Sequence, residues 1–432
     1  MKLFTRRNKN SLVFSFAIIG FIYIILNSQL VPKSFLPNTN EESAVEAENK
    51  KLVKNLVENR PKTIENVNKN EEIKRIYAID GSGMSSVNKE VIKCSKDVEL
   101  EIIGSQQDYH KADFSYFLDG VPSRDSINAF NKNGNKSHYF MVFAMESEPH
   151  SGGGNSWINS DFKMWYNLDL SFPEPATYFD VKLFLPDLLS KPKVEFEQKE
   201  KSPLVWILSN CAAFNGREKF ISKLMKKIDI DSYGFCLRNK ETHTSVRMQG
   251  NIELYSKYKF VIAIENSNCE DYVTEKLVHA VASGSIPIVA GKNNKPNYLK
   301  FMPKHSYINV YDYKSIDDLV KHLKLIESDK NEYEKYIHFK KNHNYTREYL
   351  ASLQLDELIK VAKTILGYEK EKEFFDGLIT KEKSENKLCK IARYLKNTPK
   401  DVVEKEINEK RGNRPDTSVA CLEHGNLGAD LN

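Results

Sequence analysis

The stretch "KYKFVIAIENSNCEDYVTEKLVHAVASGSIPIVAG", residues 257–291, decides the predicted fold. Its apolar run over 258–264 predicts a buried strand, and the amphipathic segment 273–283, closed by Gly284, predicts a helix. A second apolar run over 285–290 predicts another strand. Because strand, helix and strand follow one another so closely, the stretch is typical of a parallel sheet covered by helices.

The rest of the chain extends this pattern into two domains. Strands are predicted over 73–79, 98–103, 139–145 and 204–209, a strand or turn at "IDSYGF" (230–235), and helices over 216–227 (capped by Asn215), 315–327 and 331–340. We therefore predict an α/β protein with two Rossmann-like domains, residues 73–190 and 200–370. A proline- and lysine-containing segment, 186–203, would link them, and a C-terminal tail, 371–432, would follow. The last twenty residues of that tail are not expected to pack.

The N-terminus predicts a membrane anchor. Four of the five net positive charges lie in a short cytosolic tail, residues 1–10, so the remaining chain lacks the basic field that would bind nucleic acid. Residues 11–31 are then long and apolar enough to cross a bilayer, with the rest of the chain in the lumen. A cleaved signal peptide is the competing interpretation. Residues 32–72, rich in Asn, Glu and Lys, are expected to form a solvated stem.

Two groups of polar residues follow predicted strands of the second domain. In an open parallel sheet, ligands bind beyond the carboxyl ends of the strands, where helix N-termini present backbone N–H groups. Arg217 and Lys276 each lie in the first turn of a predicted helix, where a cation opposes the helix dipole. A polar connecting loop is the ordinary explanation of one such group. Two neighbouring groups indicate a shared anion, such as a nucleotide diphosphate, although no GxGxxG or GxxxxGK[ST] motif occurs.

The same stretches carry a family resemblance. Residues 257–291, with their Glu-Asn, Asp-Tyr and Thr-Glu-Lys runs, resemble the donor-binding motif of the α1,3-fucosyltransferases, glycosyltransferase family 10. "VWILSNCAAFNGREKF" (205–220) and "IDIDSYGFCLRNKE" (228–241) are similar to the segment before that motif, most of all in plant-type core α1,3-fucosyltransferases. The resemblance is strong over about 200–370 and weaker over about 138–185. It implies a GT-B type arrangement, in which the two domains face a cleft.

The resemblance also assigns a GDP-fucose site by position. It implies that Arg217 and Lys276 contact the diphosphate and that Glu275 lies near the fucose or ribose hydroxyls. Tyr272 either donates a hydrogen bond to a phosphate or packs as an aromatic side chain, and Tyr233 is open between ligand contact and packing. The polar residues that match the family motif are Ser209, Asn210, Arg217, Tyr233, Asn266, Tyr272, Glu275 and Lys276.

An acceptor site is expected in the N-terminal domain. "YFMVFAMESEPHS" (139–151) is an apolar strand that ends in Glu146, which matches the position of the family's proposed catalytic base. Glu148 is a rival base, because some relatives have proline directly after the serine. Trp165 and Tyr166 either stack on the acceptor sugar or belong to an aromatic core strand.

The resemblance implies an inverting transfer of L-fucose from GDP-fucose, in α1,3 linkage, to N-acetylglucosamine of glycoprotein N-glycans. One carboxylate suffices as base because the acceptor hydroxyl is itself the nucleophile, and fixed cations stabilise the leaving diphosphate. We therefore expect Glu146 and Lys276 to be catalytic, with no obligatory metal or other cofactor. Core N-acetylglucosamine is favoured over a peripheral one. The alternatives are a protein O-fucosyltransferase and a non-catalytic lumenal glycan-binding protein.

The resemblance and the anchor together imply a type II protein of the Golgi membrane. A weak homo-oligomer through the anchor or stem is left open, beside a stem that is only a flexible tether. Some of its six cysteines are expected to form disulfides in an oxidising lumen. The family's tail carries a Cys-x-x-Cys that ties back to the N-terminal domain, and this chain keeps only Cys389, which implies a Cys94–Cys389 bond. Cys211 and Cys236 are a second candidate pair. Cys269, beside the donor motif, is expected to be a free or packed thiol.

Overall fold

The computed structural model describes most of the two predicted domains. The described residues are 74–80, 90–95, 97–103, 111–118, 138–150, 160–167, 187–241, 248–340 and 388–412, with the separate positions 171–173, 175, 177, 178, 386, 421, 422, 425 and 427. The predicted cytosolic tail, anchor and stem, residues 1–72, lie outside them. None of the helices in the described part is both long and apolar enough to cross a membrane.

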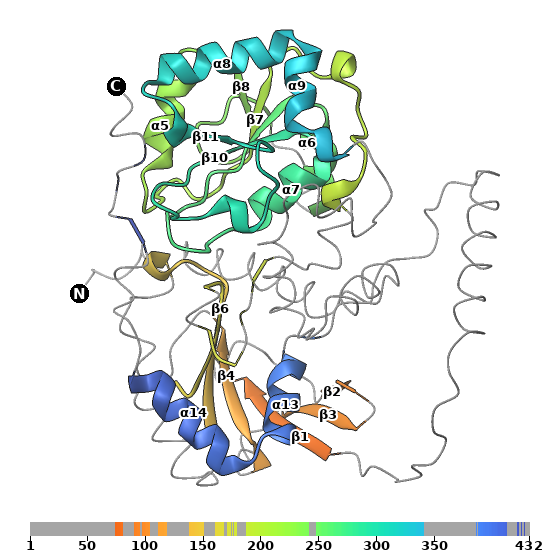
Figure 1. The fold of residues 1–432 in the computed structure, drawn as a ribbon, viewed down its shortest axis with the longest axis vertical. Helices are drawn as coiled ribbons and strands as arrows, with labels where there is room; N and C mark the ends of the chain where they lie inside the picture. The colour runs from red at the N-terminus through yellow and green to blue at the C-terminus, as the bar shows by residue number, and fades with distance from the viewer. Residues whose placement is uncertain are drawn as a thin grey trace, which may run out of the picture. The chain divides into compact units, whose positions relative to one another are not determined.

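The second half of the chain forms a five-stranded parallel sheet (Figure 1). Its strands are β7 (Leu204–Trp206), β8 (Ile230–Ser232), β9 (Phe260–Ile262), β10 (Ile286–Val289) and β11 (Ile308–Asn309). They lie side by side in the order β11-β10-β9-β7-β8, and every pair is parallel. Read from β8, this is the doubly wound order 2-1-3-4-5, which reverses between β7 and β9. Ligands of such sheets bind at this switch point, beyond the carboxyl ends of the two strands.

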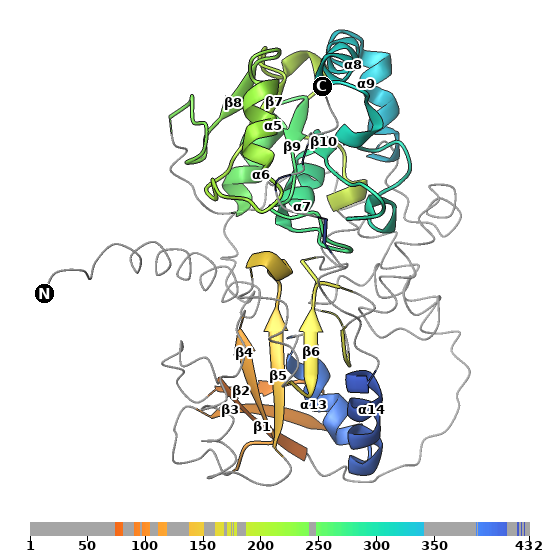
Figure 2. The ribbon, with the colours of Figure 1, turned by 90° about the vertical axis from the view of Figure 1, so that its left-hand side faces the viewer.

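Helices cover both faces of this sheet (Figure 2). They are α5 (Arg217–Leu224), α6 (Met248–Ser256), α7 (Glu275–Ser283), α8 (Ile316–Ser328) and α9 (Lys330–Tyr336). One core packs α6 and α7 against Val205 and Val261, and the other packs α5 and α8 against Trp206 and Ile262. Successive side chains of a strand point to opposite faces, so a strand covered on both faces is apolar throughout. This is why β7, β9 and β10 are continuous apolar runs, whereas β8 and β11 at the two edges of the sheet also contain polar residues.

The elements predicted for this half are confirmed, with shorter strands than the apolar runs. Helix α7 begins after Thr274, whose side chain accepts the backbone N–H of Lys276, and ends at Gly284, which adopts φ 76°. Asn215 lies one residue before the cap of α5. Gly216 occupies the cap position at φ 71°, and Asn215 Oδ1 accepts the backbone N–H of Arg217 at 3.2 Å.

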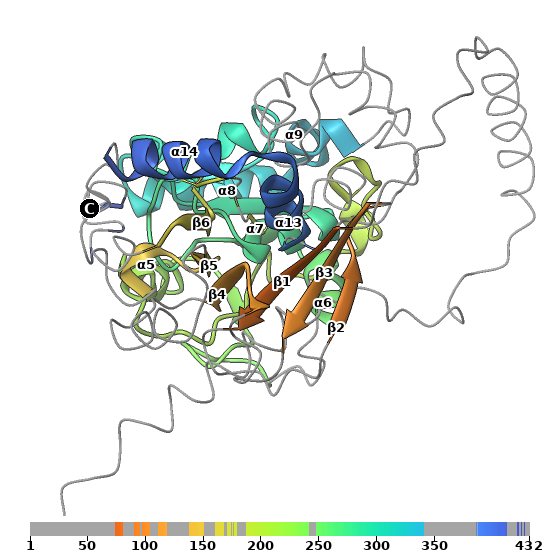
Figure 3. The ribbon, with the colours of Figure 1, turned by 90° about the horizontal axis from the view of Figure 1, so that it is seen from below.

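The first half forms a six-stranded sheet (Figure 3). Its strands are β1 (Lys74–Asp80), β2 (Glu90–Lys93), β3 (Val98–Ile103), β4 (Phe114–Leu118), β5 (Tyr139–Ala144) and β6 (Phe162–Trp165), in the order β2-β3-β1-β4-β5-β6. The strands β1, β4, β5 and β6 are parallel, as a Rossmann-like domain requires. The pair β2 and β3 is antiparallel, which the prediction did not include.

Two helices of the predicted tail belong with this first sheet. Helix α13 (Leu388–Asn397) packs against β3, and its side chains Leu388, Ile391 and Ala392 are buried. The predicted Cys94–Cys389 disulfide joins α13 to the end of β2 and is confirmed. Helix α14 (Lys400–Gly412) follows α13. Residues 388–412 are therefore a structural part of the N-terminal domain.

The predicted linker packs on the second sheet. Leu188 and Leu189 are fully buried in the core between α6, α7 and the sheet. Lys199 is buried as well, and its Nζ donates hydrogen bonds to two backbone carbonyls at 2.9 and 3.1 Å. Burial lowers the pKa of Lys199 to about 7. The segment therefore belongs to the second domain, because its leucines have an apolar surface to cover.

The described cysteines all form disulfides, and two predictions about them need correction. The candidate pair Cys211–Cys236 is confirmed. The prediction of a free or packed thiol at Cys269 is wrong, because Cys269 is bonded to Cys421, 152 residues away. The prediction that the last twenty residues do not pack is also wrong. Leu427 is only 5% exposed and lies in the core that α5 and α8 share.

Gly234→Ala is expected to destabilise the second sheet. A Cβ atom at this position would lie 2.1 Å from the carbonyl oxygen and 2.2 Å from the nitrogen of Leu208, and backbone atoms cannot turn aside. We expect the free energy of unfolding to fall by about 1–3 kcal/mol in urea denaturation. The change Ala212→Ser, at an exposed position of the loop that follows β7 and contains Leu208, should shift it by less than about 0.5 kcal/mol. Equal stability of both variants would mean that the backbones of 208 and 234 are further apart.

Candidate functional site

The predicted donor residues gather at the switch point between β7 and β9. The β7 loop, residues 207–216, leads into α5, whose first residue is Arg217. The β9 loop, residues 263–274, leads into α7, whose first two residues are Glu275 and Lys276. Two helix N-termini therefore lie at the carboxyl edge of adjacent strands, and their backbone N–H groups favour an anion there.

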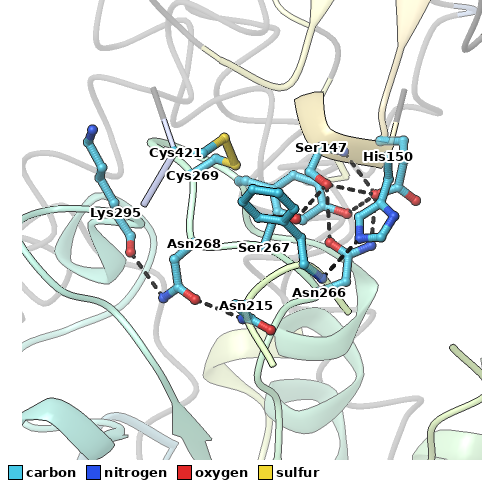
Figure 4. The surroundings of a disulfide bond; sticks show 12 residues. Ser147, His150, Asn215, Asn266, Ser267, Asn268, Cys269, Lys295 and Cys421 are labelled. Atoms are coloured by element: carbon cyan, nitrogen blue, oxygen red, sulfur yellow. Dashed lines mark hydrogen bonds between the residues drawn. A yellow bond between two sulfur atoms is a disulfide. The ribbon is translucent and has the colours of Figure 1, made fainter. Parts of the chain in front are cut away.

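Two buried asparagines connect these loops (Figure 4). Asn215 Nδ2 donates to the carbonyl of Glu265 at 2.9 Å and to Oδ1 of Asn268 at 2.7 Å. Asn268 Nδ2 donates in turn to the carbonyl of Ala290, at the end of β10, at 2.7 Å. Figure 4 shows Asn268 between Asn215 and the carbonyl of Lys295, a further acceptor at 3.3 Å. The loops that follow β7, β9 and β10 are thus held together by hydrogen bonds.

Arg217 is a buried cation with an incomplete set of partners. It is 1% exposed, and its Nη1 donates to the carbonyl of Ile264 at 2.7 Å. Within the described part of the chain its Nε has no hydrogen-bond partner, and the carboxylate of Glu218 lies 3.9 Å from it. Burial lowers the pKa of Arg217, an effect that nearby Glu265 opposes. A bound anion would complete the hydrogen bonds of this guanidinium.

Lys276 is less buried and has carboxylate partners. Its Nζ lies 3.1 Å from a carboxylate oxygen of Glu265, 3.1 Å from one of Glu275, and 2.9 Å from Oγ1 of Thr274. Burial would lower the pKa of Lys276, but the two glutamates raise it above its usual value. Burial raises the pKa of Glu265, against the opposing charge of Lys276. Lys276 is therefore a fixed cation, and a diphosphate would compete for it with Glu275, whose side chain is 31% exposed.

Glu146, just after β5, is hydrogen-bonded to the β9 loop. Its Oε1 accepts the backbone N–H of Ser147 at 2.8 Å, Nδ2 of Asn266 at 2.9 Å and the hydroxyl of Tyr272 at 2.5 Å. Ser147 Oγ donates to Oδ1 of Asn266 at 3.2 Å. The side-chain hydrogen bonds that Glu146 makes with described residues all fall on Oε1. The residue predicted as base and the predicted donor loop therefore meet.

Tyr272 is a packed aromatic side chain whose hydroxyl contacts the predicted base. It is 1% exposed, and its ring meets that of Tyr166 edge-on, with 4.8 Å between the centroids. Trp165 and Tyr166 lie in the same buried cluster and are 0% and 1% exposed. Their burial supports the core-strand alternative over stacking on an acceptor sugar.

His150 links the first sheet to both loops of the switch point. It belongs to the short 3-10 helix η2 (Glu148–His150), whose first residue, the rival base Glu148, is 5% exposed. His150 Nε2 accepts the backbone N–H of Phe214 at 3.4 Å, and its ring is hydrogen-bonded to the backbone of Asn266. Figure 4 shows His150 grouped with Ser147 and Asn266. Burial lowers the pKa of His150, so its ring is neutral at pH 7.

As the pH falls below about 6.5, we expect the free energy of unfolding of the wild type to decrease more steeply than that of the His150→Gln variant. The pKa of His150 is lower in the folded protein than in the unfolded chain. As the pH falls, the unfolded chain therefore binds a proton first, and the folded state loses stability until the pH reaches its own, lower pKa. The charged groups that face its ring are Glu146 and Glu218, which oppose this depression, and Arg217, which adds to it. Urea denaturation of both proteins between pH 5 and 7.5 measures the difference. Parallel curves would show that His150 does not titrate in this range.

Three predicted donor residues lie outside this network. Ser209 is exposed, and Asn210 Oδ1 accepts the backbone N–H of Ala212 at 3.0 Å. The hydroxyl of Tyr233 lies 2.9 Å from that of Tyr258. Tyr233 is half-buried and packs on the core around α6 and α7, which agrees with packing, one of the two roles left open for it, rather than with ligand contact.

The segment that holds both loops also decides the family. Residues 196–409 match the profile of glycosyltransferase family 10 (fucosyltransferase), C-terminal domain. These residues form a glycosyltransferase family 10 domain. This confirms the resemblance seen in residues 257–291. The family 10 domain includes Arg217 and Lys276, whereas Glu146 lies before the matched residues.

Relatives of this chain differ in the acceptor that their names state. GDP-fucose protein O-fucosyltransferase 3 of Xenopus tropicalis is 31% identical over 171 residues, which cover 38% of this chain and 36% of that protein. Glycoprotein 3-alpha-L-fucosyltransferase A of Drosophila melanogaster is 26% identical over 299 residues, which cover 67% of this chain and 57% of that protein. The chain therefore spans less than two thirds of either relative. A crystal structure of an α1,3-fucosyltransferase with GDP-fucose matches 71% of this chain and 95% of its own, with 18% identity and a TM-score of 0.43.

Several residues that hold the family 10 site together were not predicted as site residues. Glu265 and Asn268 lie in the polar run after β9, and Asn215 was assigned only as a helix cap. A signal was present in each case, because a polar residue directly between a buried strand and a helix needs a buried partner. Ser147 and His150 gave a weaker signal, since their partners lie in the other half of the chain.

Proposed function

We propose that this chain transfers L-fucose from GDP-fucose to a glycan hydroxyl, with inversion at the anomeric carbon. The observation that carries the proposal is the contact of Glu146 with Asn266 and Tyr272. This contact joins a carboxylate base to the loop at the switch point, where the donor of a doubly wound sheet binds. The match to a fucosyltransferase family and the GDP-fucose named in one relative support the choice of donor.

The donor would bind across the two helix N-termini. Backbone N–H groups of α5 and α7 and the guanidinium of Arg217 would hold the diphosphate, and Glu275 would lie near the sugar hydroxyls. Lys276 would stabilise the negative charge that develops on GDP as it leaves. Because these fixed cations supply the positive charge, we propose no obligatory metal. We also propose that the two domains form a GT-B type arrangement, with the acceptor on the Glu146 side.

The reaction would be a single displacement. The acceptor hydroxyl oxygen attacks the anomeric carbon of fucose from the face opposite GDP, and the bond from that carbon to the β-phosphate oxygen breaks. The bonding electron pair leaves with GDP, and Oε2 of Glu146 takes the proton of the hydroxyl. A β-linked donor then gives an α-linked product.

We propose core N-acetylglucosamine of glycoprotein N-glycans, in α1,3 linkage, as the acceptor. The similarity to the Drosophila glycoprotein 3-alpha-L-fucosyltransferase A, which extends over 67% of this chain, supports it. Protein O-fucosylation is the second candidate, because the Xenopus relative carries that name and is more identical over a shorter stretch. The anchor expected at 11–31 supports a further proposal, that the chain acts in the Golgi membrane with its catalytic domains in the lumen.

An acceptor panel tests the proposal. The chain would be incubated with GDP-fucose and one of three acceptors: an N-glycan with an accessible core, a galactose-capped N-acetyllactosamine glycan, and a folded protein domain without glycans. Mass spectrometry is expected to find fucose on the core residue. Transfer only to the second acceptor would indicate a peripheral enzyme, and transfer only to the third a protein O-fucosyltransferase. GDP binding without any transfer would favour the glycan-binding alternative, and no GDP binding would overturn the proposal.

A further inference from the structure

A short C-terminal strap crosses the switch point. We use this name for Cys421, Leu422, Gly425 and Leu427, which lie beyond residue 409, where the family match ends. Each of these four residues contacts either a loop that carries predicted GDP-fucose-binding residues or the hydrophobic core between α5, α8 and the sheet. The strap is therefore connected with the site, although no residue of it was expected to pack.

One end of the strap is fixed to the β9 loop. The disulfide Cys269–Cys421 joins the two segments, and Cys269 is fully buried. Next to it, the backbone N–H of Leu422 donates to the carbonyl of Asn268 at 2.8 Å. Figure 4 shows this disulfide beside Asn268 and Ser267. Asn266 and Tyr272, the residues that contact the predicted base, lie three residues to either side of Cys269.

The other end is fixed to the β7 loop. The backbone N–H of Gly425 donates to the carbonyl of Phe214 at 2.8 Å, and that of Leu427 donates to the carbonyl of Asn215 at 2.9 Å. The side chain of Leu427 is buried in the core between α5, α8 and the sheet. A Cβ atom on Gly216 would lie 3.2 Å from Cα of Gly425, so the two backbones pass close together just before Arg217.

We propose that the strap positions the donor site, by holding the β7 and β9 loops at the separation that a nucleotide diphosphate needs. The inference rests on the proposed function. The two loops come from strands on either side of the switch point, and the strap is covalently bound to one and hydrogen-bonded to the other. With the strap released, Arg217 and Asn266 would have to be ordered at the moment of binding, and pre-organised side chains avoid that cost.

The strap is opened by the double variant Cys269→Ser/Cys421→Ser in the full chain. We expect calorimetry to find GDP bound roughly 5- to 30-fold more weakly than by the wild type. We also expect KM for GDP-fucose to rise by a similar factor, with kcat changed by less than about threefold, because Asn266 is ordered again once the donor is bound and then contacts Glu146 as in the wild type. The matched control is Cys94→Ser/Cys389→Ser, which opens a disulfide of the first sheet. The control should lower stability and leave GDP affinity within about twofold of the wild type.

A second pair of variants tests the strap without changing a cysteine. Leu427→Ala removes the buried anchor of the strap while the Cys269–Cys421 bond remains, and it should weaken GDP binding roughly 3- to 10-fold. Leu427→Met conserves the buried volume and should restore most of the affinity. These variants decide the matter if the double serine variant does not fold.

The outcomes separate the two proposals. Failure of the wild type to bind GDP would overturn the proposed function. A wild type that binds GDP while the serine and alanine strap variants bind it within twofold would overturn the positioning role. Equal loss of affinity in the Cys94/Cys389 control would overturn it as well, because the effect would then follow general stability.

Discussion

Glu146→Gln is expected to slow fucosyl transfer by about 10²–10⁴-fold. Glutamine keeps the carbonyl oxygen that accepts from Asn266 and Tyr272, so the contact with the β9 loop remains. It cannot take the proton of the acceptor hydroxyl, so only the chemical step suffers. GDP affinity should stay within about twofold, because the change leaves Arg217 and Lys276 in place. Initial rates with a saturating acceptor and calorimetric GDP titrations measure the two effects separately.

Glu148→Gln is the matched control for the choice of base. Glu148 lies two residues further on, in η2, and is 5% exposed. We expect this variant to keep turnover within about tenfold of the wild type. If Glu148→Gln lost turnover while Glu146→Gln kept it, Glu148 would be the base. Normal turnover in both would place the acceptor site elsewhere.

Lys276→Ala is expected to weaken GDP binding by about 10- to 150-fold. The change removes a cation at the N-terminus of α7, and charge-assisted hydrogen bonds are worth about 1.5–3 kcal/mol. It also removes the partner of Glu265, a carboxylate that is 2% exposed. Burial already raises the pKa of Glu265, and the loss of Lys276 would raise it further, which lowers the cost of leaving this carboxyl without its cation. The affinity should therefore fall more than the free energy of unfolding.

Lys227→Ala is the control for a general effect of charge. Lys227 pairs with Asp317 at 2.5 Å on the exposed surface of the same domain, and such pairs contribute little. GDP titrations should give the same affinity for this variant as for the wild type. An equal loss in both lysine variants would point to overall charge, and no loss in Lys276→Ala would move the diphosphate away from α7.

The local parts of the fold were predictable because their signals lie within a few residues of each other. Helix α7 follows from one amphipathic segment and from Gly284, the residue type that most easily adopts its positive φ. The positions of Arg217 and Lys276 at helix N-termini are local in the same sense. The edge of the second sheet at which both helix N-termini lie could therefore be predicted before its strand order was known.

The partners of these residues could not be predicted in the same way. The sequence left Tyr272 open between a contact with a phosphate and aromatic packing, and it did not indicate that the hydroxyl donates to Glu146, 126 residues away. The sequence also suggested an unpaired role for Cys269, but its partner is Cys421. Lys276 was expected to contact the diphosphate, and in the structure it pairs with Glu265 at the start of the β9 loop. For Tyr272 and Cys269 the partner comes from a distant part of the chain that folding brings near.

By itself the sequence determined the family, the alternation of strands and helices in the second half, and which side chains lie at helix N-termini. The tertiary structure alone decided that the strand order reverses between β7 and β9, that Glu146 meets the β9 loop, and that a C-terminal strap joins the two loops. The physical reason is the range of the interactions. Apolar periodicity and caps depend on near neighbours in the chain, whereas the partners of a buried polar group or a cysteine depend on the order in which strands assemble.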